Sequence, residues 1–270
     1  MTMKQRKYAK PTAYEIVQCF LLFIAVIIAL FILKTLREYD QIDKIYEGIA
    51  QDTMETEEKG FPVDFDELLK INPNCVGWIQ FPQKGDLAQV NYPIVHSTSA
   101  NEDQYYLHHT FDRKYNFAGC IFTASWEKGD FADTTDDNTI IYGHAMNNRS
   151  MFGGVKQLRN QSFYDQNQNF YIFTPGKKIY KYHIIGVFET IDGSDAYIYQ
   201  FADTPTYEKH IKSTIDLSEV KTSLGEQYEP KHMVTLSTCN NITSKGRIVA
   251  VAVRESEMSF GDWNKESNKK

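Results

Sequence analysis

Eighteen consecutive residues without a charged side chain, 16–33, place the strongest constraint on how this chain folds. A helix of that length spans roughly 27 Å, close to the roughly 30 Å thickness of a bilayer core. A cleaved signal peptide is the alternative, but the run is longer than a usual signal-peptide core, and residues 34–38 offer no small-x-small cleavage site. We therefore predict a transmembrane signal anchor over 15–34.

Charges differ on the two sides of this span. Residues 1–14 carry only basic charges, whereas residues 35–60 are rich in acids. The positive-inside rule then predicts a cytoplasmic basic tail at 1–14 and a single-pass protein of the cell membrane, with everything after the anchor extracytoplasmic. Apolar residues recur at helical spacing in the first part of 35–60, which predicts a stalk helix and linker.

The rest of the chain divides into a globular domain at 61–256 and a polar tail at 257–270, which we predict to be disordered. Short β-type runs separated by Pro, Gly and Asp favour a barrel or sandwich over a parallel α/β sheet. A short helix capped by Asp64 or Asp66 is expected, and further helices are expected over 151–163 and over 206–215. The β-type runs are 76–81, 90–95, 119–123, 139–142, 170–173, 178–188, 233–239 and 247–253. The net charge of −6 argues against a nucleic-acid partner.

The last two runs carry reactive side chains. Alternation over 233–239 places Cys239 on the more polar strand face, and residues 240–246 have the Asn, Ser and Gly content of a turn. If the two runs pair as a hairpin, Cys239 and Arg247 face each other at the mouth of the loop. A guanidinium there can stabilise a thiolate or the oxyanion that thiolate attack creates. A buried cysteine beside a surface arginine is the simpler reading.

A catalytic cysteine needs a group that accepts its proton, so a nearby histidine would favour the catalytic interpretation of Cys239. The chain has seven histidines. His144 follows the buried-looking run 139–142 and a glycine, so it is presented at a strand end. A structural, hydrogen-bonded histidine is the alternative. Of the four cysteines, Cys19 lies in the apolar run, which leaves Cys75 and Cys120 besides Cys239. An odd number cannot pair fully within one chain, although a Cys75–Cys120 disulfide is conceivable.

These motifs together resemble the sortase family, the cysteine transpeptidases of Gram-positive bacterial surfaces. The resemblance is carried by Thr235-Leu-Ser-Thr-Cys239, Gly246-Arg-Ile-Val249, Tyr142-Gly-His144 and the single N-terminal anchor, and it covers residues 61–254. It is narrower with class B members, through the opening segment after Val63, Ser150-Met-Phe and the helix-bearing excursion at 194–220. The resemblance implies a mainly β fold, a closed sortase-type barrel of about eight strands with peripheral helices.

The resemblance also implies roles for individual residues. It makes Cys239 the nucleophile, His144 the general acid and base, and Arg247 the oxyanion or substrate-positioning group. No cofactor and no metal are implied. Some relatives have an acid just after the cysteine, where this chain has Asn240 and Asn241, and the seven-residue loop is compatible with clostridial-type enzymes. Five further positions are similar to substrate-groove residues: Ser237, Thr238, Tyr197, Tyr199 and Thr98.

The implied activity is cleavage of a C-terminal sorting signal after Thr in secreted proteins, through a thioacyl enzyme. The protein would then be joined to an amine of a lipid-linked peptidoglycan precursor. A pilus-type enzyme, which uses a lysine of another pilin subunit as the acceptor, is an alternative within the class. A non-catalytic, membrane-tethered β-barrel binding domain is the alternative outside it.

Overall fold

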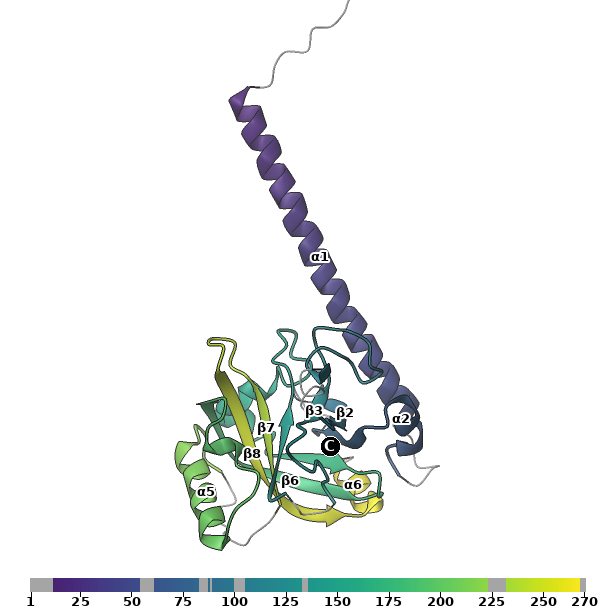
Figure 1. The fold of residues 1–270 in the computed structure, drawn as a ribbon, viewed down its shortest axis with the longest axis vertical. Helices are drawn as coiled ribbons and strands as arrows, with labels where there is room; N and C mark the ends of the chain where they lie inside the picture. The colour runs from purple at the N-terminus through teal and green to yellow at the C-terminus, as the bar shows by residue number, and fades with distance from the viewer. Residues whose placement is uncertain are drawn as a thin grey trace, which may run out of the picture. The chain divides into compact units, whose positions relative to one another are not determined.

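The computed structural model describes residues 12–53, 61–82, 87, 89–99, 105–132, 136–222 and 232–267. The chain divides into two compact units, Met1–Lys44 and Ile45–Lys270 (Figure 1). Helix α1 (Ala13–Thr53) contains a window with a mean hydropathy of 3.2, and it is long and apolar enough to cross a membrane. Most of the basic tail predicted at 1–14 lies outside the described residues.

The last turns of α1 belong to the second unit and pack within it. Tyr46 and Ile49 are buried, and the Tyr46 hydroxyl donates a 2.8 Å hydrogen bond to the carbonyl of Gly119. The Tyr46 ring also meets that of Tyr92 edge-on, with 5.2 Å between centroids. The predicted stalk helix is therefore helical through Thr53, and residues 54–60 lie outside the described part of the chain.

The second unit is built on a closed eight-stranded barrel with the strand order β1-β2-β3-β4-β7-β8-β6-β5. Parallel pairing joins β2 to β3 and β4 to β7, and the other neighbours are antiparallel. All eight predicted β-type runs are strands, so the closed barrel is confirmed. The strands are β1 (Cys75–Gln80), β2 (Asn91–His96), β3 (Ile121–Thr123), β4 (Asn138–Tyr142), β5 (Asn169–Phe173), β6 (Ile179–Ile191), β7 (Met233–Cys239) and β8 (Gly246–Met258).

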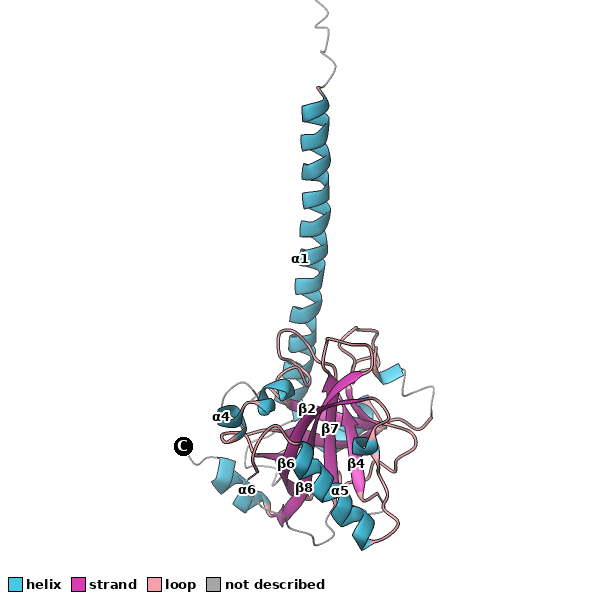
Figure 2. Ribbon diagram, turned by 90° about the vertical axis from the view of Figure 1, so that its left-hand side faces the viewer, coloured by secondary structure: helices cyan, strands magenta, loops and turns pink. Residues whose placement is uncertain are grey.

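Peripheral helices start where side chains cap them. Asp64 accepts a 3.1 Å bond from the backbone N–H of Glu67 at α2 (Phe65–Ile71), and Asp203 accepts a 2.9 Å bond from Thr206 at α5 (Thr204–Leu217). Helix α5 packs against β6 and β8 on the outside of the barrel, through an apolar cluster that includes Ile211 (Figure 2). The helices predicted after Asp64 and over 206–215 are confirmed.

The helix predicted over 151–163 is wrong in detail. The segment forms a 3-10 helix η3 (Val155–Arg159) and a one-turn α4 (Gln161–Tyr164). Asn160 interrupts the helical spacing, because it is extended and its side chain caps α4 by accepting a bond from Phe163 N–H. Two glycines precede η3, and they delay the start of regular structure.

The predicted disordered tail is also a correction. Strand β8 continues to Met258, which pairs with Ile179 of the long β6, and α6 (Phe260–Ser267) follows. Ser259 accepts a 3.1 Å bond from Asp262 N–H at the start of α6, and Trp263 meets Phe173 edge-on at 5.4 Å. The tail is polar overall, but pairing with β6, the Trp263–Phe173 contact and a 2.9 Å ion pair between Lys181 and Glu266 hold it against the barrel.

A line of stacked rings runs through the barrel core and ends at a buried histidine. Phe81 stacks on Phe170 at 5.3 Å, Phe170 on Tyr182 at 5.4 Å, and Tyr182 meets His232 at 6.0 Å. Such aromatic pairs contribute about 0.5–1.5 kcal/mol each beyond the area they bury. The His232 ring bonds the Tyr182 hydroxyl at 2.9 Å and Thr139 Oγ1 at 3.2 Å.

Acid should therefore destabilise the barrel through His232. Burial and the nearby Arg254 guanidinium lower the pKa of His232 to about 3, whereas its unfolded value is near 6.5. Between these two pKa values only the unfolded chain binds the proton. The contribution of His232 to the free energy of unfolding is therefore fully present above about pH 6.5, and it is lost as the pH falls towards 3. The slope from this residue should be about 1.4 kcal/mol per pH unit. The free energy of unfolding is measured with urea at several pH values from 7 to 4. Its dependence on pH should be shallower for His232→Gln than for the unsubstituted chain, and it should be unchanged for His108→Gln, which replaces an exposed histidine. Equal slopes would contradict this origin.

Candidate active site

Register in the β7–β8 hairpin places the cysteine opposite the arginine. Cys239 pairs with Arg247, and Ser237 pairs with Val249. Directly opposed residues in an antiparallel pair share a sheet face. Val249 belongs to the apolar cluster under α5, so Cys239, Ser237 and Arg247 lie on the outer barrel face that carries the helix-bearing excursion. The predicted hairpin and the Cys239–Arg247 pairing are confirmed.

The parallel pairing of β4 with β7 brings the histidine to the same place. Tyr142 pairs with Ser237, so continuing the register by two residues sets His144 level with Cys239. Two bonds hold the segments together on either side of this level. Gly143 N–H donates to the carbonyl of Ser237 at 3.1 Å, and the Asn241 side chain donates to the carbonyl of Ala145 at 3.1 Å. Neighbouring strands are about 4.8 Å apart, so the backbones of His144 and Cys239 lie side by side, and both residues line the same pocket.

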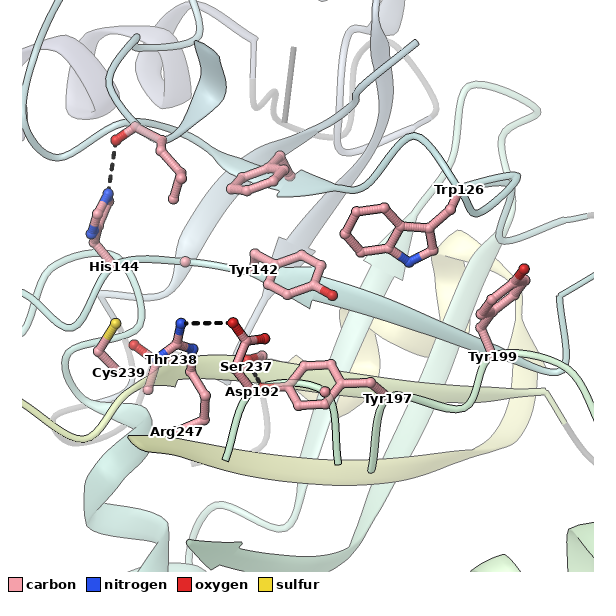
Figure 3. Close-up of a pocket in the computed structure, with 14 residues that line it drawn as sticks. Trp126, Tyr142, His144, Asp192, Tyr197, Tyr199, Ser237, Thr238, Cys239 and Arg247 are labelled. Carbon is pink, nitrogen blue, oxygen red and sulfur yellow. Dashed lines mark hydrogen bonds and ion pairs between the residues drawn. The ribbon is translucent and has the colours of Figure 1, made fainter. Parts of the chain in front are cut away.

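A backbone carbonyl selects the tautomer of His144. Its Nε2 lies 2.7 Å from the carbonyl oxygen of Leu107, which can only accept, so Nε2 carries a proton. In the neutral ring Nδ1 is then the basic nitrogen, and Figure 3 shows His144 and Cys239 at the same end of the pocket. Burial lowers the pKa of His144, and the adjacent His108 lowers it further, while the Leu107 bond raises it.

The imidazole should consequently be neutral at pH 7. His144 is expected to titrate with a midpoint below its ordinary value of 6.5, because burial outweighs the bond to Leu107. A histidine-labelled NMR titration measures this midpoint directly, with His144→Gln assigning the signal. A midpoint at or above 6.5 would show that His144 is not buried as described.

Backbone carbonyls and one carboxylate hold the guanidinium of Arg247, on the strand that pairs with the strand of Cys239. Its Nη1 donates to the carbonyls of Ser244 at 3.2 Å and Gly246 at 3.1 Å, and its Nη2 lies 3.4 Å from Asp192 Oδ2. The Arg247 side chain is only 20% exposed. A fixed positive charge at this position can stabilise negative charge that develops on an atom bonded to the Cys239 sulfur.

These side chains border one pocket of about 460 Å³ (Figure 3). His144, Cys239 and Arg247 lie toward one end, and Trp126 and Tyr199 lie at the other. An aromatic wall connects the two ends: the Tyr142 ring stacks with Tyr197 at 6.2 Å and meets Trp126 edge-on at 6.3 Å. The pocket is thus elongated and mostly apolar, with polar chemistry at one end, as suits an extended peptide.

The predicted groove residues divide into those that reach the pocket and one that does not. Ser237 and Tyr197 line it and share a 2.8 Å hydrogen bond, and Tyr199 lines it beyond them. Thr238 also borders it, although strand alternation turns its buried hydroxyl to the face opposite Cys239. Thr98 does not line the pocket but lies exposed after β2, so its assignment to the groove is not supported.

Sequence reasoning missed several residues of the pocket. Asp192 and the carbonyl of Leu107 carry no local signal, because one lies in a β6 connection and the other acts through its backbone. Trp126 and Tyr142 could have been suspected, since each is a large aromatic residue at or just after a strand end. Among the described residues, no group of three or more His, Cys, Asp or Glu side chains could hold a metal ion.

The other cysteines differ from Cys239. Cys75 and Cys120 are buried free thiols, and burial raises the pKa of each to about 12. Both are therefore protonated at neutral pH and poorly nucleophilic. Cys19 lies exposed on the apolar part of α1. Cys239 is the cysteine that lines the pocket.

A cysteine, a histidine and an arginine around one pocket are the groups that thiol-dependent acyl-transfer enzymes use. Comparison with known proteins identifies the family. The sortase domain family matches residues 86–255. The chain is 30% identical to sortase B of Listeria monocytogenes over 68% of this chain and 70% of that protein. It is 28% identical to sortase B of Staphylococcus aureus, over 88% and 94% of the two chains.

Solved structures agree with these sequence relatives. The crystal structure of Clostridium perfringens sortase B superposes with a TM-score of 0.62 at 27% identity, covering 72% of this chain and 100% of that one. The chain therefore belongs to the sortase family of cysteine transpeptidases, and its relatives place it in class B of that family. It is an enzyme, so the alternative of a non-catalytic binding domain no longer applies.

Proposed function

We propose that the chain is a membrane-anchored transpeptidase that joins secreted proteins to the cell wall. Its substrates would carry a C-terminal sorting signal cleaved after Thr, and the acceptor would be an amine of a lipid-linked peptidoglycan precursor. The observation that carries the proposal is the convergence of Cys239, His144 and Arg247 on one end of an elongated pocket. Ser237 and Tyr197, joined by their hydrogen bond, would contact the substrate next to the reacting carbonyl.

In the first half-reaction, neutral His144 accepts the thiol proton of Cys239 through Nδ1 as the sulfur attacks the Thr carbonyl carbon. The carbonyl oxygen becomes an oxyanion, and the guanidinium of Arg247 stabilises it. When this intermediate collapses, the peptide C–N bond breaks, and the imidazolium of His144 gives its proton to the leaving amine. A thioester between the Thr carbonyl and Cys239 remains.

The second half-reaction repeats these roles in reverse. The acceptor amine attacks the thioester carbon, and His144 takes the proton that the amine loses. The C–S bond then breaks, Cys239 leaves as a thiolate and recovers its proton, and a new amide bond joins the substrate to the acceptor. His144 would act as base and acid a second time, because the Leu107 carbonyl holds Nε2 and leaves Nδ1 as the nitrogen that exchanges the proton.

Anchoring would serve this reaction by concentrating the reactants. Helix α1 has the length and hydropathy of a membrane span, and we propose that its N-terminal end faces the cytoplasm. A secreted substrate and a lipid-linked acceptor would then share one surface with the enzyme. Confinement of this kind raises effective concentration without any new contact between the partners.

A peptide panel tests the function. The full chain in detergent micelles is incubated with sorting-signal peptides, and mass spectrometry identifies the products with and without an added amine. We expect cleavage after Thr and transfer to a stem-peptide amine. Transfer to a pilin lysine in preference to the stem peptide would favour the pilus-type alternative. Failure to cleave any Thr-containing signal would contradict the proposal.

A further inference from the structure

Asp192 lies beside Arg247 because two strands end together. In the β6–β8 ladder Thr190 pairs with Arg247 and Ile191 pairs with Gly246. The next residue, Asp192, continues this contact outside the ladder, since its N–H donates a 2.9 Å bond to the carbonyl of Lys245. Its backbone is thus fixed against the loop that carries the arginine.

The carboxylate of Asp192 completes the support of the guanidinium. Arg247 Nη1 is held by the carbonyls of Ser244 and Gly246, and Nη2 faces Asp192 Oδ2 at 3.4 Å. Three acceptors from two connections therefore fix one planar group. The Asp192 side chain is 59% exposed and that of Arg247 is 20% exposed, and the pair lies at the edge of the pocket that both residues line (Figure 3).

The residues directly after the cysteine have other partners. Asn240 donates to Glu189 Oε1 at 2.5 Å and accepts bonds from two backbone N–H groups of its own loop, at 2.9 and 3.1 Å. Asn241 donates to the carbonyl of Ala145. Both therefore shape the loop and tie it to the histidine segment. Among the described residues, Asp192 is the acid that forms an ion pair with Arg247.

Building on the proposed function, we propose that Asp192 is a positioning residue for this reaction. It orients the Arg247 guanidinium toward the oxyanion that forms when Cys239 attacks the substrate carbonyl, and it does so without touching the substrate carbonyl. An arginine fork stabilises an oxyanion only in the right orientation, and small misplacements of a catalytic group reduce rates strongly. The carboxylate that supports the arginine thus comes from the β6 connection, not from the position after the nucleophile.

The test compares Asp192→Asn with a matched control, Asp216→Asn. Asp216 is 60% exposed and pairs with Lys212 on α5, away from the pocket. With the full chain in micelles and the peptide that it cleaves best, Asp192→Asn should lower kcat about tenfold and change KM less than about twofold. Asp192→Glu should restore kcat to within about threefold, because the charge returns at an exposed position. Asp216→Asn should match the unsubstituted enzyme.

A double substitution separates positioning from a general effect on the fold. In an Arg247→Lys background the planar fork is gone, so adding Asp192→Asn should change kcat less than about twofold. Because the Asp192 carboxylate is 59% exposed, loss of its charge should leave the thermal midpoint of Asp192→Asn within about 2 °C of the parent. A tenfold loss that persists in the Arg247→Lys background would overturn the proposal, as would unchanged kcat in Asp192→Asn.

The outcome with Cys239→Ala separates this inference from the function on which it builds. If Cys239→Ala is inactive and Asp192→Asn is fully active, only the role of Asp192 fails. If Cys239→Ala still cleaves the peptide, the proposed reaction fails and the role of Asp192 fails with it.

Discussion

Cys239→Ala should abolish cleavage of a sorting-signal peptide, with a loss on the order of 10⁴-fold or more. The sulfur is the atom that would form the thioester, and Cys239 is the one cysteine among the residues that line the pocket. Cys75 and Cys120 are buried with strongly raised pKa values, and they do not line the pocket. Cleavage is measured by chromatography of the peptide fragments.

The matched control for this substitution is Cys19→Ala. Cys19 is exposed on the apolar part of α1, so its removal should leave peptide cleavage unchanged. Cys239 is half-buried and is the last residue of β7, so replacing it by alanine removes one partly exposed sulfur and should leave the barrel folded. A Cys239→Ala protein that is folded and still cleaves the peptide would exclude Cys239 as the nucleophile.

Arg247→Ala should lower kcat by about 10²–10³-fold, the usual cost of removing one oxyanion-stabilising group. The guanidinium is directly opposite Cys239 in the hairpin register and only 20% exposed, so water cannot fully replace its charge. If the arginine acts mainly on the transition state, kcat should fall far more than KM rises. Steady-state kinetics over a range of peptide concentrations gives both constants.

Arg247→Lys is the informative companion. Lysine keeps the charge but loses the planar fork that the carbonyls of Ser244 and Gly246 orient. We expect an intermediate kcat, between the values for the alanine variant and the unsubstituted enzyme. If alanine and lysine variants both retain full activity, the oxyanion must be stabilised elsewhere, for example by backbone N–H groups alone.

The parts of the fold that the sequence predicted well depend on local patterns. The β7–β8 hairpin is set by strand alternation and a short polar turn, so the pairing of Cys239 with Arg247 could be predicted from 21 consecutive residues, 233–253. The short helix after Asp64 is local in the same way, because an Asp side chain caps its first turn. The membrane-length helix follows from one uncharged run.

The parts that could not be predicted depend on contacts between distant segments. His144 reaches Cys239 only through the parallel pairing of β4 with β7, which no short window contains, and family resemblance was needed to select it among the histidines. Asp192 is brought to Arg247 by the β6–β8 ladder in the same manner. The prediction of a disordered tail was wrong because Trp263 packs against Phe173, which is far away in the sequence. The polar residues next to Trp263 give no sign of this contact.

Intact-mass spectrometry of the enzyme during turnover tests the central claim most directly. The full chain is mixed with a sorting-signal peptide without any acceptor amine, quenched in acid within seconds, and digested to locate the added mass. We predict that the peptide portion ending in Thr is attached to Cys239 as a thioester that hydroxylamine releases. A protein that cleaves the peptide but never carries this mass, or carries it on another residue, would contradict the mechanism.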